Sequence, residues 1–532
     1  STNGGLIVPN QFFIKNSKQQ ASFNAYKFNT KRIVSTIFMI GTSWKNQLFL
    51  DITGRNDWSS ALVYSYGIGN FSYFYPSVSG SWIITETFKD KLPKWVSFAK
   101  VRGSWAQVGN DTSPYYINSG YSVATYQRGD KKIYGMTIPE NMKSTNLKPE
   151  RKNAWEVGLD WRFLDSRIGV DLTYYKENTR NQIMTINVPW ESGVKEKLIN
   201  AGNIQNSGIE IALNTTPIKK KQWQWDLNFT YTRNRNKIVE LSPDVTSYIN
   251  LDGAANYGNY RIASVAKVGS DYGMLMSDSW IKTDEKTGKP VVGYTNKFRT
   301  VYYKRGGTVK EVGSMLPNFL GSLNSTLRWK DLSLYVLFDA RFGGYVASYN
   351  SRYATAYGFS GETEKYRKGM TWTSKYANAQ DKVFTDGFIP DVVFDAGTIV
   401  TTPGGTNQDV SGMTYQEAYE KGYVEPAHLQ SAAYFKNSWG TGVINDDWFK
   451  KINYIALREI TLSYNVPTKI SSYIGAKNLS LSFTGRNLAY LLNTAPNHEN
   501  PESVRGTGAA QFRMRSFMPY TASYLFTLNA TF

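Results

Sequence analysis

Residue types that carry most enzyme chemistry are scarce in this chain of 532 residues. It contains no cysteine and only two histidines, His428 and His498. The lack of thiols excludes disulfides, thiolate zinc sites and cysteine nucleophiles, and two histidines are too few for most histidine-based catalysis. No GxSxG, Walker or HExxH pattern occurs in the sequence. We therefore expect no catalytic residues, no metal site, no cofactor and no enzymatic activity.

Charged side chains in short motifs could instead bind a ligand. Arg55 and Asp57, in the motif GRNDW, could hydrogen-bond a cargo molecule or a partner protein. The alternative, which we favour, is an interaction of these two side chains with each other that fixes a loop. The adjacent acids Asp446 and Asp447 could hold a surface cation, but such a pair is more often part of a charged loop. His498 lies between Asn and Glu, and we expect it to be solvated.

Aromatic side chains gather in one long segment, residues 343–449, which contains many tyrosines. Tyr353, Tyr357 and Trp372 are its candidates for stacking on a sugar ring or on a peptide side chain. Such rings also pack against one another inside large loops, and we expect this second role for most of them. At least one ring in the segment should contact cargo or a partner protein.

The charge balance is basic, with 61 Lys and Arg against 42 Asp and Glu, which gives a formal net charge of +19. The basic residues are scattered, and the densest cluster, 219–221, lies in a proline-containing turn without a nucleic-acid-binding motif. We therefore expect no nucleic-acid partner. Aromatic residues make up 15% of the chain, although its mean hydropathy is −0.42. This combination favours a surface at a membrane–water boundary.

The elements that must position these residues are predicted to be strands. The range 151–164 shows the pattern clearly, because apolar residues alternate with polar ones. Its apolar face should contact lipid and its polar face should line the lumen of a barrel. We assign Trp155, Val157, Leu159 and Trp161 to the lipid face, and Glu156, Asp160 and Arg162 to the lumen face.

The same alternation recurs along the chain and predicts 13 strands. Their expected ranges are 31–42, 47–56, 71–84, 98–108, 151–164, 167–184, 203–216, 222–239, 317–330, 331–342, 450–466, 478–490 and 518–532. Short turns alternate with four long segments, 109–150, 240–316, 343–449 and 491–517. Short turns at one end and long loops at the other are typical of an outer-membrane barrel. The competing interpretation is a soluble β-sandwich or repeat protein with one solvated face.

Two motifs inside the expected strands should interrupt regular pairing. Gly208 in QNSGIE predicts a β-bulge or bend, because glycine relieves backbone strain. Asn487 and Leu488 in TGRNL should cap the end of a strand. We expect neither motif to have ligand contact as its main role.

Seven segments, taken together and in order, match one protein family. They are WKNQLFLDITGRNDWSSAL (44–62), SYFYPSVSGSWIITETF (72–88), VRGSWAQVGND (101–111), NLKPERKNAWEVGLDWRFLDSRIGVDLTYYKENTRNQI (146–183), INAGNIQNSGIEIALNTTPI (199–218), LREITLSYNVP (457–467) and SLSFTGRNLAYL (480–491). These segments span nearly the whole chain. They resemble the C-terminal half of the SusC-like (SusC/RagA) TonB-dependent outer-membrane transporters of Bacteroidota.

For the fold, the resemblance implies an all-β, transmembrane antiparallel β-barrel of about 22 strands. Residues 1–532 would be the C-terminal portion of this barrel, with short periplasmic turns and the four long loops outside the cell. The plug domain, the TonB-contacting segment and about nine further strands would lie on an N-terminal part that this chain lacks. The odd number of expected strands agrees, because an antiparallel barrel needs an even number to close.

For the function, the resemblance implies TonB-dependent active import of a bulky nutrient across the bacterial outer membrane. The expected cargo is an oligosaccharide, with a peptide as the second candidate. The implied partners are a SusD-like surface lipoprotein that acts as a lid, the TonB complex, the N-terminal barrel half with its plug, and lipid with lipopolysaccharide. Pairs of transporter and lid would associate as dimers. The alternative function is a passive outer-membrane channel or a surface-adhesion barrel.

The last expected strand ends on an aromatic residue. Its alternate positions are occupied by Tyr524, Phe526, Leu528 and, at the end of the chain, Phe532. This pattern resembles the signal by which outer-membrane barrels are recognised for assembly. We therefore assign these four residues to barrel assembly.

Overall fold

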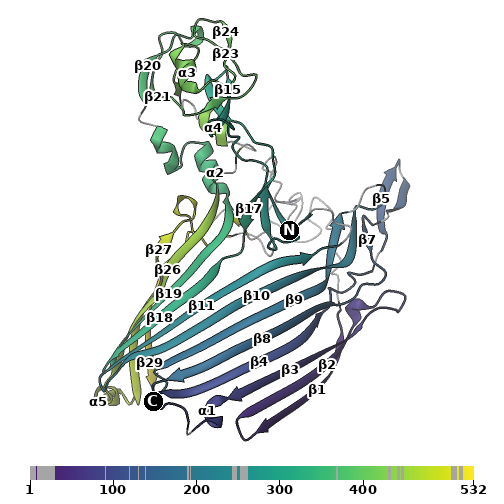
Figure 1. Ribbon diagram of the computed structural model, residues 1–532, viewed down its shortest axis with the longest axis vertical. Helices are drawn as coiled ribbons and strands as arrows, with labels where there is room; N and C mark the ends of the chain where they lie inside the picture. The colour runs from purple at the N-terminus through teal and green to yellow at the C-terminus, as the bar shows by residue number, and fades with distance from the viewer. Residues whose placement is uncertain are drawn as a thin grey trace.

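The main feature of the computed structural model is one large, curved sheet (Figure 1). The sheet has 15 strands, of which two short ones lie off the main path, so that 13 form one continuous ladder. The structure describes residues 8, 30–89, 91–118, 120–129, 131–137, 139–187, 191, 193–242, 248–251, 262–366, 369–428, 433–439, 444, 448–504, 512–514 and 519–532. Asp446 and Asp447 lie outside the described residues.

The 13 strands of this ladder, which we call the wall, follow one another in chain order, and each pairs antiparallel with the next. They are β1 (Ile33–Trp44), β2 (Leu48–Ser59), β3 (Ser72–Ile83), β4 (Val96–Asn110), β8 (Glu150–Phe163), β9 (Ile168–Asn187), β10 (Glu196–Lys219), β11 (Trp223–Glu240), β18 (Phe319–Trp329), β19 (Leu332–Ser348), β26 (Phe449–Val466), β27 (Asn478–Asn493) and β29 (Ser523–Thr531). The two strands off the path are β7 (Asn141–Lys143), beside β10, and β28 (Arg513–Met514), beside β19.

Each wall strand overlaps one of the ranges that alternation predicts, and most ends agree within a few residues. The largest differences are that β10 begins at Glu196 instead of 203, and that β19 continues to Ser348 instead of ending at 342. In β19 the extension follows a bulge at Gly343 and Gly344, whose φ angles are 88° and 90°. Pairing with β26 resumes at Tyr345. Alternation stops at such a bulge, although the strand itself continues.

The two faces of the wall differ in chemistry as predicted. On one face, Arg102 of β4 reaches over Gly158 of β8 and donates two hydrogen bonds, of 3.0 and 2.9 Å, to the carboxylate of Asp171 on β9. A Cβ atom at Gly158 would lie 2.6 Å from the Arg102 guanidinium, so a side chain there would displace Arg102 from this position. On the opposite face, the rings of Trp155 and Tyr174 lie 5.4 Å apart. We call the charged face the lumen face and the apolar face the outer face.

The bulge predicted at Gly208 is wrong. Gly208 pairs in regular register with Tyr175 of β9 and with Asn234 of β11. A Cβ atom there would lie 2.4 Å from the Tyr175 ring, so the glycine makes room for a neighbouring side chain. The register of β10 against β11 instead shifts between Asn203 and Ile204 and again after Thr215. Close approach of a neighbouring group is the alternative reason for a glycine in a strand.

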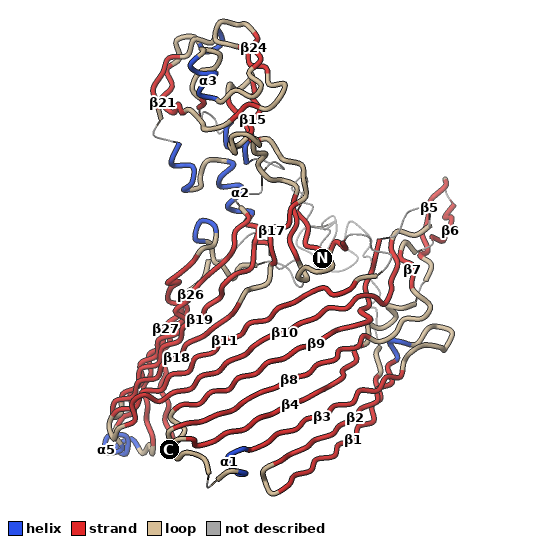
Figure 2. The backbone as a smooth tube through the Cα atoms, in the orientation of Figure 1, coloured by secondary structure: helices blue, strands red, loops and turns tan. Residues whose placement is uncertain are grey.

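Two of the four long segments fold together into an ordered unit, although alternation predicts no structure for them. Its elements, which we call the loop module, are β15 (Val291–Thr295), β16 (Thr300–Tyr303), β20 (Met370–Thr373), β21 (Val383–Phe388), β22 (Val393–Phe394), β23 (Ile399–Thr401), β24 (Asn407–Asp409), β25 (Ala427–His428), α3 (Tyr415–Glu420) and α4 (Ala433–Trp439). β15 from the first segment pairs parallel with β22 from the second. Figure 2 shows this module standing beyond the loop end of the wall.

Smaller elements complete the loop end and the turns. Four strands form a second sheet: β12 (Tyr248–Asn250), β13 (Ile262–Lys267), β14 (Met274–Ser277) and β17 (Lys310–Ser314). A hairpin joins β5 (Ser122–Arg128) to β6 (Lys131–Thr137), and the remaining helices are α1 (Ile84–Thr87), α2 (Tyr349–Ala356) and α5 (Thr468–Ser471). Within the described ranges, every helix is too short or too polar to cross a bilayer.

Candidate functional site on the lumen face

Arg55 and Asp57 lie near the end of β2, on the lumen face. Arg55 Nε donates a hydrogen bond of 2.6 Å to Asp57 Oδ1, and a second guanidinium nitrogen donates to Ser35 Oγ of β1 at 3.1 Å. Asp57 is buried and also accepts a hydrogen bond from the Tyr75 hydroxyl of β3. The favoured Arg–Asp interaction is therefore present, and it ties three neighbouring strands together.

A second carboxylate, Asp111, extends this arrangement beyond the end of β4. Ser59 donates a hydrogen bond to Asp111, and Lys31 forms an ion pair with it. We call Lys31, Arg55, Asp57, Tyr75 and Asp111 the rim cluster. Both carboxylates have compensating donors, whereas the Arg55 side chain is still 47% exposed. The guanidinium can therefore fix the strand ends and contact a ligand at the same time.

A pocket of about 520 Å³ lies beside the rim cluster. It is lined by Tyr73, Tyr75, Gln107, Glu150 and Arg151, among other residues. The pocket opens because the ladder between β3 and β4 includes no residue before Ser77, and the preceding Pro76 has no N–H group to donate to β4. Tyrosine rings beside amide and charged groups can hold a polar ligand that also has apolar faces.

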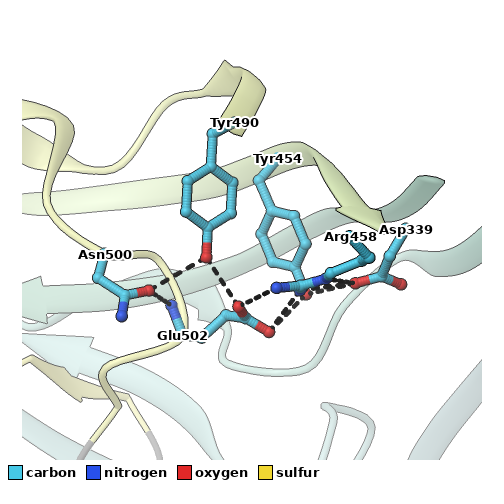
Figure 3. A network of polar contacts seen from close by, with 6 residues as sticks. All are labelled: Asp339, Tyr454, Arg458, Tyr490, Asn500 and Glu502. Carbon is cyan, nitrogen blue, oxygen red and sulfur yellow. Dashed lines mark hydrogen bonds and ion pairs between the residues drawn. The ribbon is translucent and has the colours of Figure 1, made fainter. Parts of the chain in front are cut away.

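A second polar network lies on β19, β26 and β27, and Figure 3 shows its six members. Arg458 donates two hydrogen bonds of 2.7 Å to the two oxygens of Glu502, and its Nη2 also donates to Asp339 Oδ2 at 2.8 Å. Tyr490 donates to Glu502 at 2.7 Å, and Tyr454 lies within 3.4 Å of both carboxylates. Burial raises the pKa of Glu502, but the hydrogen bonds from Arg458 and Tyr490 outweigh this effect and hold it below its usual value.

This network holds the loop residues Asn500 and Glu502 against the wall, and a bulge makes these contacts possible. Asn487 has a φ angle of 51° and lies inside β27, so the predicted strand-end cap at Asn487 and Leu488 is wrong. Both residues lie opposite Arg458, where the register of β26 against β27 shifts. Arg458 is also the extra residue of a bulge against β19. A bulge rotates one side chain out of the alternation, and here it turns a cation toward the lumen face.

Sequence reasoning missed Arg458 and Glu502, yet one signal could have identified the arginine. Strict alternation from Ile460 and Leu462 would put Arg458 on the outer face, in contact with lipid. A charge at such a position is costly in a barrel, by roughly 2–4 kcal/mol at the bilayer midplane. A charged residue in an apolar position of a strand therefore predicts a bulge. Glu502, in a long loop, carries no comparable signal.

The aromatic candidates of the segment 343–449 lie on different elements from the rim cluster. Tyr353 is in α2 and Tyr357 directly follows it, and both are about half exposed, at 45% and 54%. Trp372 is in β20, where its ring stacks on Phe384 at 4.8 Å and its Nε1 donates to Glu425 at 3.3 Å. The structure thus leaves the two tyrosines accessible and uses much of Trp372 for packing.

The four residues assigned to barrel assembly lie in and after β29. Tyr524, Phe526, Leu528 and Phe532 are 67%, 71%, 58% and 71% exposed. The register pairs Phe526 with Phe483 of β27, and the rings of Phe483 and Tyr524 stack at 6.2 Å. Their exposed apolar side chains agree with a strand that meets lipid or another protein.

The two histidines and one buried acid are further titratable groups outside the wall. His428 is buried beside the rings of Trp372 and Phe384, and this burial lowers its pKa. His498 is exposed, as expected. Glu499 is buried and accepts a hydrogen bond of 2.9 Å from the Ser348 hydroxyl; burial raises the pKa of Glu499 to about 7. Within the described residues, no three histidines or acids gather in a metal-binding arrangement.

An apolar outer face, a charged lumen face and long loops at one end together define an outer-membrane β-barrel. The family described as "TonB dependent receptor-like, beta-barrel" matches residues 15–303, which is more than half of the chain. The chain belongs to this family. The SusC-like resemblance, the antiparallel barrel fold and the outer-membrane location inferred from the sequence are thereby confirmed.

Curated relatives match between about half and most of the chain. TonB-dependent receptor P26 of Formosa agariphila is 23% identical over 486 residues, which are 89% of this chain and 43% of that protein. TonB-dependent receptor SusC of Bacteroides thetaiotaomicron is 28% identical over 270 residues, or 49% of this chain and 26% of SusC. The chain therefore spans less than half of the length of these relatives.

Solved structures show the same fold. A structure described as the RagAB peptide importer in the open-open state matches 97% of this chain and 49% of its own chain, with a TM-score of 0.65 and 16% identity. Its closed-closed state gives a TM-score of 0.64 at the same identity. At this identity the likeness shows the fold alone.

Proposed function

We propose that the protein imports a bulky nutrient across the outer membrane by TonB-dependent active transport, with an oligosaccharide as the leading cargo. The observation that carries the proposal is the family membership, joined to a wall whose lumen face bears hydrogen-bonding side chains along its length. In this proposal the short turns are periplasmic and the four long loops are extracellular. The TonB complex acts through an N-terminal barrel half with a plug, which completes the wall.

The pocket beside the rim cluster supports a cargo with both ring faces and hydroxyl groups. Tyr73 and Tyr75 offer aromatic surfaces, while Glu150 offers hydrogen-bond acceptors on the same lining. Arg55 is exposed next to them. A peptide is the second candidate, because Arg55 and Glu150 could pair with its carboxyl and amino ends, and because related folds include a peptide importer.

The lid partner that we propose is a SusD-like surface lipoprotein, and exposed rings near α2 support it. Tyr353, Tyr357 and Phe359 are 45%, 54% and 84% exposed, so three accessible rings occur within seven residues. Exposed aromatic groups of this kind are typical of protein contacts. Pairs of transporter and lid would then associate as dimers.

Transport is tested by uptake in cells that carry the complete transporter. Uptake of a labelled glycan or peptide library should require TonB, and substituting Tyr73 and Tyr75 by Ala should lower uptake of the correct cargo class at least tenfold. Uptake that continues without TonB, or an open conductance in planar bilayers, would support the passive channel instead. Binding without uptake in cells that have TonB would favour the adhesion barrel.

The lid contact is tested separately by co-purification of the neighbouring surface lipoprotein. A variant with Tyr353, Tyr357 and Phe359 changed to Ser should retain less lipoprotein than the wild type. The matched control changes Tyr473, which is 89% exposed at the turn end of the wall, and should retain all of it. Equal retention by both variants would remove this surface from the proposal.

A further inference from the structure

The outer face of β8 to β11 can be described row by row, because the register pairs residues directly across these four strands. From the turn end of β8 toward the loop end, the rows are Trp161, Val170, Leu213 and Phe229; Leu159, Leu172, Ile211 and Tyr231; Val157, Tyr174, Ile209 and Arg233; Trp155, Lys176, Ser207 and Arg235; Asn153, Asn178, Gln205 and Lys237; and Arg151, Arg180, Asn203 and Glu240. The first two rows are entirely apolar or aromatic, and charge begins in the third.

All charges in these outer rows are positive except that of Glu240, which pairs with Asn203 where the register of β10 against β11 shifts. The six cations, which we call the basic belt, are Arg151, Lys176, Arg180, Arg233, Arg235 and Lys237. The lumen rows that alternate with them instead contain Glu156, Glu177 and Glu210, with Lys152 as their cation. Apart from Glu240 and Lys152, these four strands therefore separate their charges by face, with cations outside and carboxylates inside. A solvated loop end without a specific function would carry both signs on each face.

The positive charges of the basic belt are not neutralised by ion pairs with other described residues. None of its six members has an ion-pair partner within the described part of the chain, and the three cations of β11 are exposed. A hollow of about 780 Å³ lies next to Arg233, Arg235 and Lys237. Tyr231, Phe319, Gln205 and Ser207 contribute to its lining, and Asp271 is the carboxylate that borders it. Three cations facing one carboxylate leave this hollow electropositive.

The height of the belt in the membrane follows from the aromatic residues below it. Trp223 stacks on Trp329 at 5.5 Å near the turn end, and Tyr231 meets Phe319 at 5.4 Å near the loop end. The eight residue steps from Trp223 to Tyr231 rise roughly 20 Å, at about 3.4 Å per step and a tilt of about 40°. This rise is close to the ~25 Å apolar band of a barrel, so Arg233, Arg235 and Lys237 lie at the level of lipid headgroups.

We propose that the basic belt binds the phosphate groups of phosphorylated lipids in the outer leaflet, with Arg233, Arg235 and Lys237 as the central contacts. Guanidinium groups hold phosphate oxygens with two parallel hydrogen bonds, and the lysine adds a point charge. The apolar rows beneath the belt contact the acyl chains of the same lipid, and the hollow beside β11 admits its headgroup. The inference depends on the barrel's place in the membrane and is independent of the cargo.

The test uses the complete transporter purified from outer membranes, with bis-phosphorylated lipid A as the probe and native mass spectrometry as the readout. Changing Arg233, Arg235 and Lys237 to Ser should weaken lipid binding roughly 100-fold, because each basic side chain near an anionic surface contributes about a factor of five. The matched control changes Lys219, Lys220 and Lys221 to Ser, which removes the same charge at the turn end, and should bind as the wild type does. Heat-modifiable migration checks that each barrel is assembled.

Further measurements distinguish a phosphorylated membrane lipid from free phosphate as the bound ligand. Monophosphoryl lipid A should bind more weakly than the bis-phosphorylated form, and inorganic phosphate at the same concentration should not displace either lipid. The variant with Arg233 and Arg235 changed to Lys keeps the charge and should bind within about fivefold of the wild type. Equal binding by the Ser variant and the wild type, equal binding of lipids with and without phosphate, or displacement by inorganic phosphate would each overturn the proposal.

Discussion

The wall and the loop module are built on different physical bases, although both consist mainly of strands. In the wall, each strand is held by ladders to both neighbours, and few side chains of the spanning strands are fully buried. The loop module has a packed core in the usual sense, in which Phe394, Val400 and Tyr415 are at most 1% exposed. The wall therefore depends on register and on the surrounding solvent, whereas the module depends on packing.

This difference decides where a substitution has its effect. A change on the outer face of the wall alters transfer into lipid and leaves no cavity, whereas a change in the module core leaves a cavity and spares the membrane. The wall and the loop module should consequently lose stability independently of each other. The following predictions, from the largest expected effect to the smallest, test that separation.

The largest effect is expected in the core of the loop module. Phe394→Ala removes a ring that contacts Tyr415 and Tyr294 and should destabilise the module by roughly 3–5 kcal/mol. Limited proteolysis should then cut the module while the barrel still shows heat-modifiable migration. The control Phe359→Ala changes a ring that is 84% exposed and should leave protease resistance intact. Loss of barrel assembly in Phe394→Ala would contradict the separation.

On the outer face of the wall, Leu159→Arg should hinder insertion by roughly 2–4 kcal/mol if it lies near the bilayer midplane. Leu159 lies in an entirely apolar row with Leu172, so the new charge would meet lipid. The control Thr230→Arg puts the same side chain on the lumen face in the adjacent row. Folding into vesicles, followed by denaturant titration, measures both variants. Equal losses would show that the assignment of the faces is wrong.

Where the loops join the wall, Glu499 should make stability depend on pH. Burial raises its pKa from 4.5 to about 7, so its contribution is fully present below pH 4.5 and is lost as the pH rises through 7. The free energy that is needed to open the segment around Ser348 and Glu499 should therefore fall by up to about 3 kcal/mol as the pH increases. Hydrogen exchange measures this, and Glu499→Gln should abolish the dependence. A dependence that survives the substitution would exclude Glu499 as its source.

The smallest effect, and one of opposite sign, is expected at Asp395 in the loop module. Burial raises its pKa, but Lys282 at 2.8 Å and Lys304 at 3.4 Å outweigh this effect and lower it. Its contribution is therefore present at neutral pH and is lost as the pH falls through the lowered value. Asp395→Asn should cost less than about 1 kcal/mol, because the lysines are partly solvated. Thermal unfolding of the module at pH 7 checks the sign and the size.

The wall could be predicted from the sequence because successive side chains of a strand alternate between lipid and lumen, which gives a period of two residues. Alternation located every wall strand and placed Trp155 and Asp160 on opposite faces. It failed at bulges, as at Gly343 and Asn487, because an extra residue shifts the phase without ending the strand. The loop module was not predicted, because β15 and β22 are paired across about a hundred residues and neither alone has a recognisable pattern.

The candidate site was predictable only in its local part. Arg55 and Asp57 are two residues apart in one strand, so their interaction follows from the alternation. Asp111 and Glu502 join their clusters from loops, and no sequence spacing brings them to the wall. The basic belt was hidden for a related reason. Its cations come from three strands, and their common face emerges only when the register of these strands is known.

The parallel pairing of β15 with β22 also has a consequence for biogenesis. β15 belongs to the segment before β18, and β22 to the segment after β19, so the hairpin of these two wall strands lies between the halves of the module. The first half cannot bury Val292 and Val301 until the second half has been translocated past the same hairpin. Until the second half joins it, the first half therefore exposes apolar surface that the finished module buries. The completed module then connects the segment before β18 with the segment after β19.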